Sequence, residues 1–271
     1  MTTDDTARAL GSVGRGALRL TLYLLLTLLL IPVQGVAVGL RSPLSRRLPI
    51  LYHRLCARLL GLELVVRGER MGSGPVLFVS NHSSYLDITV LGALLPASFV
   101  AKSEVAGWPF FGLLAKLSRT VFVERRARSS VGRQRDDIGD RLEAGDSLIL
   151  FPEGTSSDGN RTLPFKSALF AVASRRIGDQ PLTVQPISVT PTRLDGIPMG
   201  VAFRPFYAWY GDMDLAPHLW QVFQLGGMTV EVEFHPPVTI DGFPNRKALA
   251  DHCQRSIAQG VACAVSGRPA Q

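Results

Sequence analysis

One histidine and one aspartate, five residues apart, carry the first chemical signal in the sequence. His82 follows an apolar run at 76–80, and Asp87 lies in the first turn of the next apolar stretch. Within a single helix the two side chains would be about 140° apart, but a histidine in the turn before a helix can meet that carboxylate. The carboxylate would fix the imidazole tautomer and leave the other ring nitrogen to accept a proton. The stretch from Ser84 to Asp87 fits a capping box equally well, so both interpretations stay open.

The elements that position this pair form an alternating pattern. From residue 62 onward, short apolar runs alternate with helix-like stretches, which predicts an α/β fold with a mostly parallel central sheet flanked by helices. The expected strands are 62–66, 76–80, 98–101, 121–124, 147–151, 184–190, 201–207 and 229–234. The expected helices are 85–95, 108–117, 131–142, 166–176 and 246–265. Most of 197–220 is irregular and aromatic, and no role is assigned to it.

Three polar clusters follow strands of the predicted sheet, at 81–87, 124–126 and 152–155. Ligands of open α/β sheets gather at the carboxyl ends of strands. We therefore expect the three clusters to converge on one cleft.

The sequence contains no second reactive motif. A G-x-S-x-G elbow, a P-loop, an H-E-x-x-H helix and a C-x-x-C pair are all absent. Cys56, Cys253 and Cys263 give no disulfide framework, which is typical of a reducing compartment, and small core residues are the favoured interpretation. A histidine without a protein nucleophile indicates direct transfer, in which the base deprotonates an alcohol of the second substrate.

Two of these motifs together resemble the lysophospholipid acyltransferase family, typified by bacterial 1-acyl-glycerol-3-phosphate acyltransferases. They are Asn81-His82-x4-Asp87 and the run Phe-Pro-Glu-Gly-Thr at 151–155. The run Val-Phe-Val-Glu-Arg at 121–125 is similar to the second motif of that family, and Val-Gln-Pro-Ile-Ser at 184–188 to the fourth. The resemblance covers roughly residues 60–190, with the motifs in the expected order.

The resemblance implies a role for each motif residue. His82 would be the general base that deprotonates a lysolipid hydroxyl, and Asp87 would orient and charge-stabilise it. The hydroxyl would attack the thioester of acyl-CoA or acyl-carrier protein, with no acyl-enzyme intermediate, no metal and no cofactor apart from that donor. The substrate-binding residues would be Glu153, Gly154, Thr155, Arg125 and Lys102, with Arg125 on an anionic head group.

The chain departs from the family pattern at Ser156, where members commonly carry an arginine directly after Phe-Pro-Glu-Gly-Thr. Arg161 could supply the missing cation from the same loop. Alternatively, the acceptor lacks a glycerol phosphate, since 151–159 is similar to members that acylate lyso-ornithine lipid. The sequence leaves lysophosphatidic acid and lyso-ornithine lipid both open.

The positive charge is concentrated at the N-terminus. The chain carries +7, and residues 1–60 hold eight arginines and two aspartates, a net +6. The other 211 residues hold 21 basic and 20 acidic side chains, a net +1. Nucleic-acid binding needs a basic surface on the folded domain, so it is disfavoured. We expect a basic, leucine-rich membrane-anchoring arm at 1–60 and an acyltransferase catalytic domain at 61–271.

Between Arg19 and Arg41 the arm has 21 residues without a formal charge. As a helix this run would be about 30 Å long, comparable to the hydrocarbon core of a bilayer. Pro32 interrupts it, so spanning the bilayer and dipping into one leaflet both stay open. A cleaved signal peptide and a buried core helix are the alternatives.

Residues 45–60 form the second part of the arm. Arg47, Arg54 and Arg58 fall on one helical face and Leu48, Leu51, Leu55 and Leu59 on another. That pattern is typical of a basic amphipathic helix in an anionic lipid interface.

The sequence thus predicts a membrane-attached O-acyltransferase of lipid biosynthesis at the cytoplasmic face of the inner membrane. Its partners would be the lipid bilayer, a lysolipid acceptor and an acyl-CoA or acyl-carrier-protein donor, without nucleic acid. Two alternatives share the fold: a thioester-independent phospholipid transacylase and a non-catalytic lipid-binding scaffold.

Overall fold

One mixed sheet organises the protein. The computed structural model describes residues 10–72, 74–123 and 131–267, and its main sheet has the strand order β1-β10-β8-β2-β5-β3-β4. Along this path only the β10–β8 pair is antiparallel, which confirms the predicted mostly parallel sheet. The strands are β1 (Leu62–Arg67), β2 (Val76–Ser80), β3 (Ala97–Lys102), β4 (Val121–Val123), β5 (Ser147–Leu150), β8 (Thr183–Leu194) and β10 (Met228–Phe234); short β9 (Ile197–Pro198) pairs with β8, and β6 (Arg176–Ile177) pairs with β7 (Gln180–Pro181).

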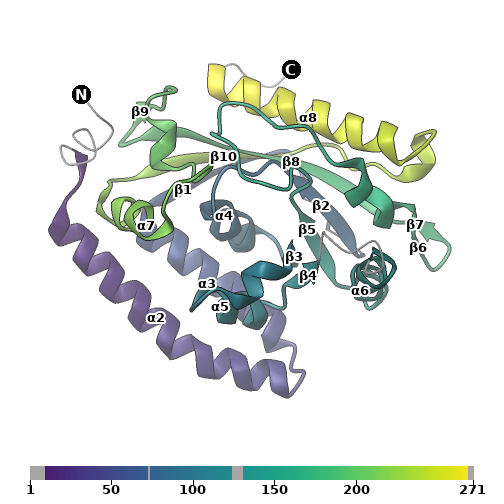
Figure 1. Ribbon diagram of the computed structural model, residues 1–271, viewed down its shortest axis with the longest axis horizontal. Coiled ribbons are helices and arrows are strands. Elements are labelled where there is room, and N and C mark those ends of the chain that lie inside the picture. Colours follow the sequence, from purple (N-terminus) through teal and green to yellow (C-terminus); the bar gives the residue numbers. More distant parts are fainter. Residues whose placement is uncertain (1–9, 73, 124–130, 268–271) are drawn as a thin grey trace.

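Helices cover both faces of the sheet (Figure 1). On one side lie α2, α3, α4, α5 and α7, and on the other lie α8 and the 3-10 helix η2. Their bounds are α2 (Val13–Gly39), α3 (Leu44–Leu60), α4 (Leu86–Leu94), α5 (Phe111–Leu117), α6 (Val131–Glu143), α7 (Leu215–Gln224), α8 (Arg246–Ser266), η1 (Ser103–Gly107), η2 (Ser167–Ser174), η3 (Arg204–Phe206) and η4 (Ile240–Gly242).

The side-chain alternation of β2 divides the core in two. Val76 and Phe78 pack with the α3 and α4 residues on one face. Leu77 and Val79 pack with α8 and η2 on the other. Because both faces are covered, all five residues of β2 are buried, as expected for a central parallel strand. The end of β2 is therefore a rigid support for the turn that follows it.

The arm is part of this packing. Cys56, Ala57 and Leu60 of α3 are buried against the body, and α3 lies so close to α4 that a Cβ on Gly92 would collide with the His53 ring. The predicted interfacial helix at 45–60 is thus a helix of the core with one exposed side. The division of the chain at residue 60 stays a prediction.

Three of the arm's arginines bind helix ends. Arg15 donates to the Gln224 carbonyl at 2.7 Å and Arg19 to the Leu225 carbonyl at 2.7 Å, at the C-terminus of α7. Arg54 donates to the Ala93 carbonyl at 2.9 Å, near the end of α4. Cations are favourable at helix C-termini, so part of the arm's charge fastens it to the body.

The predicted strand at 201–207 is wrong. The segment forms turns and the helix η3, because Pro205 lacks a ladder donor and because the side chains of Arg204 and Tyr207 turn inward and are buried. Helix α7 was not expected from the sequence. The predicted helix at 166–176 is instead the 3-10 helix η2, followed by the β6–β7 hairpin.

Candidate active site

The side chain of Asn81 holds the turn between β2 and α4, because it pairs with the backbone of β8 as a strand residue would. The Asn81 side chain donates to the Val189 carbonyl at 2.9 Å and accepts from the Val189 amide at 2.9 Å. These two bonds extend the pairing of β2 with β8 past the end of β2. The position of the next residue, His82, is thereby fixed relative to the sheet.

His82 and Asp87 meet, as the general-base interpretation requires. His82 Nδ1 lies 2.9 Å from Asp87 Oδ2, with the aspartate fully buried and 21% of the histidine side chain exposed. The imidazole ring stacks on Phe151, with ring centroids 4.2 Å apart. An ionised carboxylate accepts a hydrogen bond from Nδ1–H, which leaves Nε2 as the basic nitrogen.

Asp87 also caps the start of α4, which is the alternative interpretation that the sequence left open. Asp87 Oδ2 accepts from the backbone amides of Ser83 at 2.7 Å and Ser84 at 2.9 Å. Reaching back to the Ser84 amide is the bond that the capping-box pattern predicts. One carboxylate oxygen therefore orders both the start of α4 and the imidazole ring.

A tyrosine that the sequence did not single out completes the site. Tyr207 is fully buried and donates its hydroxyl proton to Asp87 Oδ1 at 2.8 Å. Burial, with Asp87 beside it, raises the pKa of Tyr207 well above its ordinary value, so the phenol stays a donor. The same segment is tied to the turn through Trp209, whose amide donates to the Ser83 carbonyl at 2.8 Å. The segment 197–220 thus has a role in supporting Asp87.

The side chain of Glu153 contacts the backbone of His82. Its Oε1 accepts from the His82 amide at 3.3 Å, and the residue is 2% exposed. Burial is the main reason that the pKa of Glu153 is raised to about 8, and the nearby Asp87 charge acts in the same direction. Hydrogen bonds from the His82 and Leu163 amides act in the opposite direction. Glu153 is therefore mostly a neutral acid at pH 7, and its Oε2 has no hydrogen-bond partner among the described residues.

This perturbed carboxyl predicts a pH-dependent stability. Between its ordinary pKa of 4.5 and the raised value of about 8, the native state holds a proton that the unfolded chain has released. The free energy of unfolding should then fall as pH rises across this window, by up to about 1.4 kcal/mol per pH unit. Glu153→Gln should remove that slope in urea denaturation from pH 5 to 9. Glu69→Gln, at an exposed position, is the matched control, and an unchanged slope in Glu153→Gln would contradict the prediction.

The other predicted site residues have different surroundings. Gly154 is buried with a left-handed φ of 76°, a conformation that costs most other residues about 1–2 kcal/mol. Thr155 is exposed in the same loop, and Lys102 is exposed at the carboxyl end of β3. Arg125 lies outside the described residues. The loop is joined to the site by the Ser157 amide, which donates to the His82 carbonyl at 2.9 Å.

An apolar cavity of about 180 Å³ lies beside the turn. Tyr85 and Leu86 line it next to the histidine turn, Tyr23 and Cys56 line it from α2 and α3, and Trp108 lines it from the loop before α5. Its lining is almost wholly apolar, which suits a hydrocarbon chain.

Comparisons with known proteins agree with this geometry. The acyltransferase family model matches residues 61–190. The lyso-ornithine lipid O-acyltransferase of Brucella abortus is 45% identical to the chain over 90% of the chain and 92% of that relative. The chain belongs to the acyltransferase family. The resemblance seen in the sequence motifs is thereby confirmed, and the protein is an acyltransferase enzyme.

More distant relatives fix the fold of this acyltransferase. The 1-acyl-sn-glycerol-3-phosphate acyltransferase of Neisseria gonorrhoeae is 33% identical over 77% of each chain. The crystal structure of the 1-acyl-sn-glycerophosphate acyltransferase of Thermotoga maritima superposes with a TM-score of 0.67 at 20% identity, covering 95% of this chain and 98% of that one. The similarity in architecture extends over the arm as well as the sheet.

The thiols of the acyltransferase are placed as core residues. Cys56 and Cys253 are buried, and burial raises the pKa of each thiol to about 12. A thiol that stays protonated is a poor nucleophile. Within the described ranges, no group of three or more His, Cys, Asp and Glu side chains is arranged to hold a metal ion.

Proposed function

We propose that this acyltransferase moves a fatty acyl chain from an acyl-CoA or acyl-carrier-protein thioester to the hydroxyl of lyso-ornithine lipid. The observation that carries the proposal is the His82–Asp87 pair, 2.9 Å apart, in a turn whose next residues, Tyr85 and Leu86, line an apolar cavity. A base supported by a buried carboxylate suits an alcohol acceptor, and the cavity suits an acyl chain.

The proposed reaction is a single displacement at the thioester carbonyl. His82 Nε2 takes the proton of the acceptor hydroxyl while its oxygen forms the new ester bond to the carbonyl carbon. The carbon–sulfur bond then breaks, and the imidazolium returns the proton to the departing thiolate. Asp87 stabilises the transient imidazolium through its 2.9 Å contact with Nδ1. Glu153, Gly154, Thr155, Lys102 and Arg125 are proposed to seat the acceptor.

The acceptor is proposed from the loop after β5. Ser156 provides no cation next to Glu153 and Gly154, whereas a phosphate is bound best by charge-assisted contacts with arginine. The Brucella abortus relative, which matches over most of both chains, is named for lyso-ornithine lipid. An acceptor without a phosphate fits both observations.

An assay with two acceptors tests this function. Purified enzyme would receive labelled acyl-CoA or acyl-carrier protein with either lyso-ornithine lipid or lysophosphatidic acid. Because a charge-assisted contact contributes about 1.5–3 kcal/mol, we expect at least a tenfold higher kcat/KM for lyso-ornithine lipid. The reverse preference would assign the enzyme to lysophosphatidic acid. Product without any thioester would indicate a transacylase, and no product with any pair of substrates would indicate a scaffold.

Tyr207 is proposed as a positioning residue, and Tyr207→Phe should separate this role from packing. The substitution removes the hydroxyl donor to Asp87 Oδ1 and leaves the ring. Without this bond the carboxylate holds the imidazole less firmly in position, so kcat should fall about tenfold with KM unchanged. The acidic limb of the pH–rate profile should move to higher pH, since Asp87 then stabilises the imidazolium more strongly. Tyr210→Phe, in the same segment, is the control, and equal profiles for both variants would refute the role.

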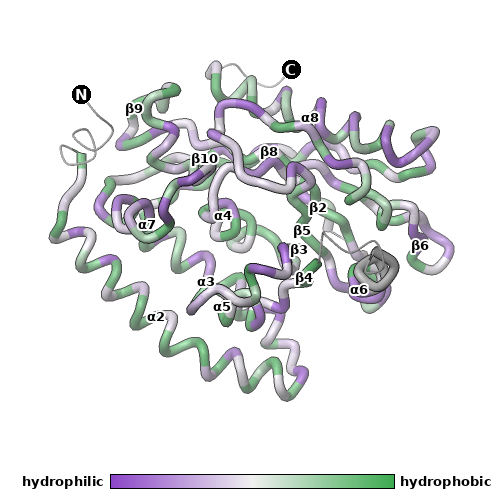
Figure 2. The backbone as a smooth tube through the Cα atoms, in the orientation of Figure 1, coloured by the Kyte–Doolittle hydropathy of each residue, from purple (hydrophilic) through white to green (hydrophobic). Residues whose placement is uncertain are grey.

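The arm is proposed to lie along the membrane at its cytoplasmic face. Helix α2 is the one described helix that is long and apolar enough to cross a bilayer, and Figure 2 shows its mostly hydrophobic course. One side of α2 is fastened to the body at several levels: Thr27 contacts Tyr52 at 3.0 Å, and Gln34 donates to the Leu117 carbonyl at 2.7 Å. A crossing α2 would draw α3, α5 and α7 into the hydrocarbon, so burial of its outer side in one leaflet is favoured.

Leu25→Ser combined with Leu29→Ser should detach the protein from membranes. These side chains are 59% and 69% exposed on the outer side of α2, and burying a leucine fully contributes about 1.5–3 kcal/mol. We expect the vesicle partition coefficient to fall at least about tenfold in flotation experiments. Ile197→Ser combined with Val265→Ser, at exposed apolar positions on β9 and α8, is the matched control. Equal loss in both double variants would exclude α2 as the membrane contact.

A further inference from the structure

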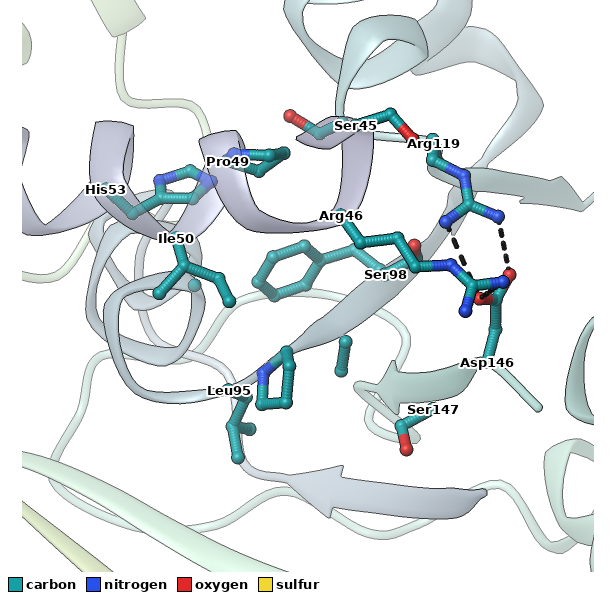
Figure 3. A pocket seen from close by; sticks show the side chains of 15 residues that line it. Ser45, Arg46, Pro49, Ile50, His53, Leu95, Ser98, Arg119, Asp146 and Ser147 are labelled. Carbon is teal, nitrogen blue, oxygen red and sulfur yellow. Dashed lines mark hydrogen bonds and ion pairs between the residues drawn. The ribbon is translucent and has the colours of Figure 1, made fainter. Parts of the chain in front are cut away.

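A second cavity, with charged and polar side chains in its lining, lies at the edge of the sheet opposite to the carboxyl end of β2. It is bounded by residues at the amino ends of β3 and β5, among them Ser98 and Asp146, and by the first turns of α3 (Figure 3). The histidine turn follows the carboxyl end of β2, which is parallel to β5. The cavity shares His53, Phe99 and Ser118 with the apolar cavity, but Arg46, Arg119 and Asp146 line this one and not the other. The proposed reaction assigns no role to these three charged residues.

Three arginines from three different elements converge on one carboxylate in this cavity. Asp146, with 6% of its side chain exposed, contacts Arg46 at 3.0 Å, Arg119 at 2.7 Å and Arg141 at 2.6 Å. Figure 3 shows the first two reaching it from α3 and from the end of α5. Arg141 is held further by the Arg119 carbonyl at 3.0 Å and by Ser98 Oγ at 3.0 Å.

The cluster carries an excess of two positive charges. Among the described residues, Asp146 is the one carboxylate in contact with the three guanidinium groups. The pKa of Arg119 is lowered mainly by burial, and the positive charges of Arg141 and Arg46 lower it as well. The negative charge of Asp146 acts in the opposite direction. Arg46 keeps 54% of its side chain exposed, so its remaining donors are accessible to a ligand.

Two features of this cluster oppose folding stability. Arg46 and Arg47 lie in the first turn of α3, where the helix dipole disfavours cations by about 0.3–1 kcal/mol each. Arg119 follows α5 with a left-handed φ of 60°, at a helix end where glycine is the less strained residue. Unfavourable charge and backbone strain in one place indicate a functional constraint.

The cavity is also half apolar. Ile50, Leu95 and Phe99 line it opposite the arginines. Beside its α3 wall, Leu40 and Leu44 are 75% and 44% exposed at the turn from α2 to α3. A ligand with an anionic head and an apolar part would contact both halves.

We propose that this cavity binds the phosphate group of an anionic phospholipid, with the fork-shaped guanidinium groups as its donors. The choice of a membrane lipid rests on the proposed attachment through α2, which places the α2–α3 turn at the lipid surface. The bound headgroup would fix the orientation of the enzyme on an anionic membrane, through charged residues that the proposed reaction does not use.

The test uses the full chain in neutral maltoside micelles. Thermal melting would be followed while soluble dihexanoyl phosphatidylglycerol or inorganic phosphate is added. We expect phosphatidylglycerol to raise the melting temperature of wild type, with an apparent affinity that falls at least about tenfold in Arg46→Ala. Arg47→Ala changes the same charge one residue away and should behave as wild type. Arg46→Lys keeps the charge but loses the fork-shaped guanidinium group, so its apparent affinity for phosphatidylglycerol should lie between those of Arg46→Ala and wild type.

Each outcome has a defined meaning. Equal losses in Arg46→Ala and Arg47→Ala would reduce the effect to diffuse surface charge and overturn the site, as would the absence of any shift with either ligand. Inorganic phosphate that binds as tightly as phosphatidylglycerol would overturn the lipid as the source of the phosphate. Melting does not depend on turnover, so failure of the acyl-transfer proposal would leave this result unchanged.

Discussion

His82→Ala should lower kcat for acyl transfer by about 10²–10⁴-fold, the usual contribution of a positioned general base. The imidazole stacks on Phe151 with 4.2 Å between ring centroids, and its Nδ1 contacts Asp87, so Nε2 is the nitrogen left to take the proton of the acceptor hydroxyl. The measurement is initial-rate transfer from a labelled thioester donor to the preferred acceptor.

The fold of His82→Ala should survive, since the residue lies in a turn whose position depends on Asn81 and Asp87. Urea denaturation and vesicle flotation check this point. His252→Ala, on α8, is the matched control for loss of an imidazole and should keep wild-type turnover. A folded, membrane-bound His82→Ala that retains near wild-type kcat would show that the base is misassigned.

The sequence predicted those parts of the site that depend on local spacing. His82 and Asp87 lie in one strand–turn–helix unit, and the strand at 76–80 was predicted to the residue, because a doubly buried strand is a continuous apolar run. Glu153 was placed correctly beside them because parallel strands end at the same edge of a sheet.

The remaining site residues come from long-range packing that has no local pattern. Tyr207 is 120 residues from Asp87, and a buried tyrosine hydroxyl in an irregular segment has no periodicity to reveal its partner. The arm is a similar case: its arginines have the pattern of a membrane-binding helix, but Arg15, Arg19 and Arg54 donate to helix-end carbonyls. The number of charges does not distinguish an arginine that binds lipid from an arginine that binds the carbonyl groups at a helix end.

Asp87 is expected to give the largest combined effect on stability and activity. Its carboxylate accepts four hydrogen bonds of 2.9 Å or less, from His82, Ser83, Ser84 and Tyr207. Three of these donors are buried. Asp87→Ala leaves them without a partner, and removing one side of a buried charged pair costs about 3–5 kcal/mol. The free energy of unfolding should fall by that amount in urea, and acyl transfer should be lost.

Asp87→Asn separates the two functions of this residue. An amide oxygen in the place of Oδ2 still accepts from both serine amides and from His82 Nδ1, while the NH₂ group in the place of Oδ1 can donate to the Tyr207 oxygen. The free energy of unfolding of Asp87→Asn should then stay within about 1.5 kcal/mol of the wild-type value. Turnover should still fall about tenfold or more, because a neutral amide stabilises the imidazolium less than a carboxylate does. Equal turnover in Asp87→Asn and wild type would mean that Asp87 only holds the turn, and that its charge has no part in the reaction.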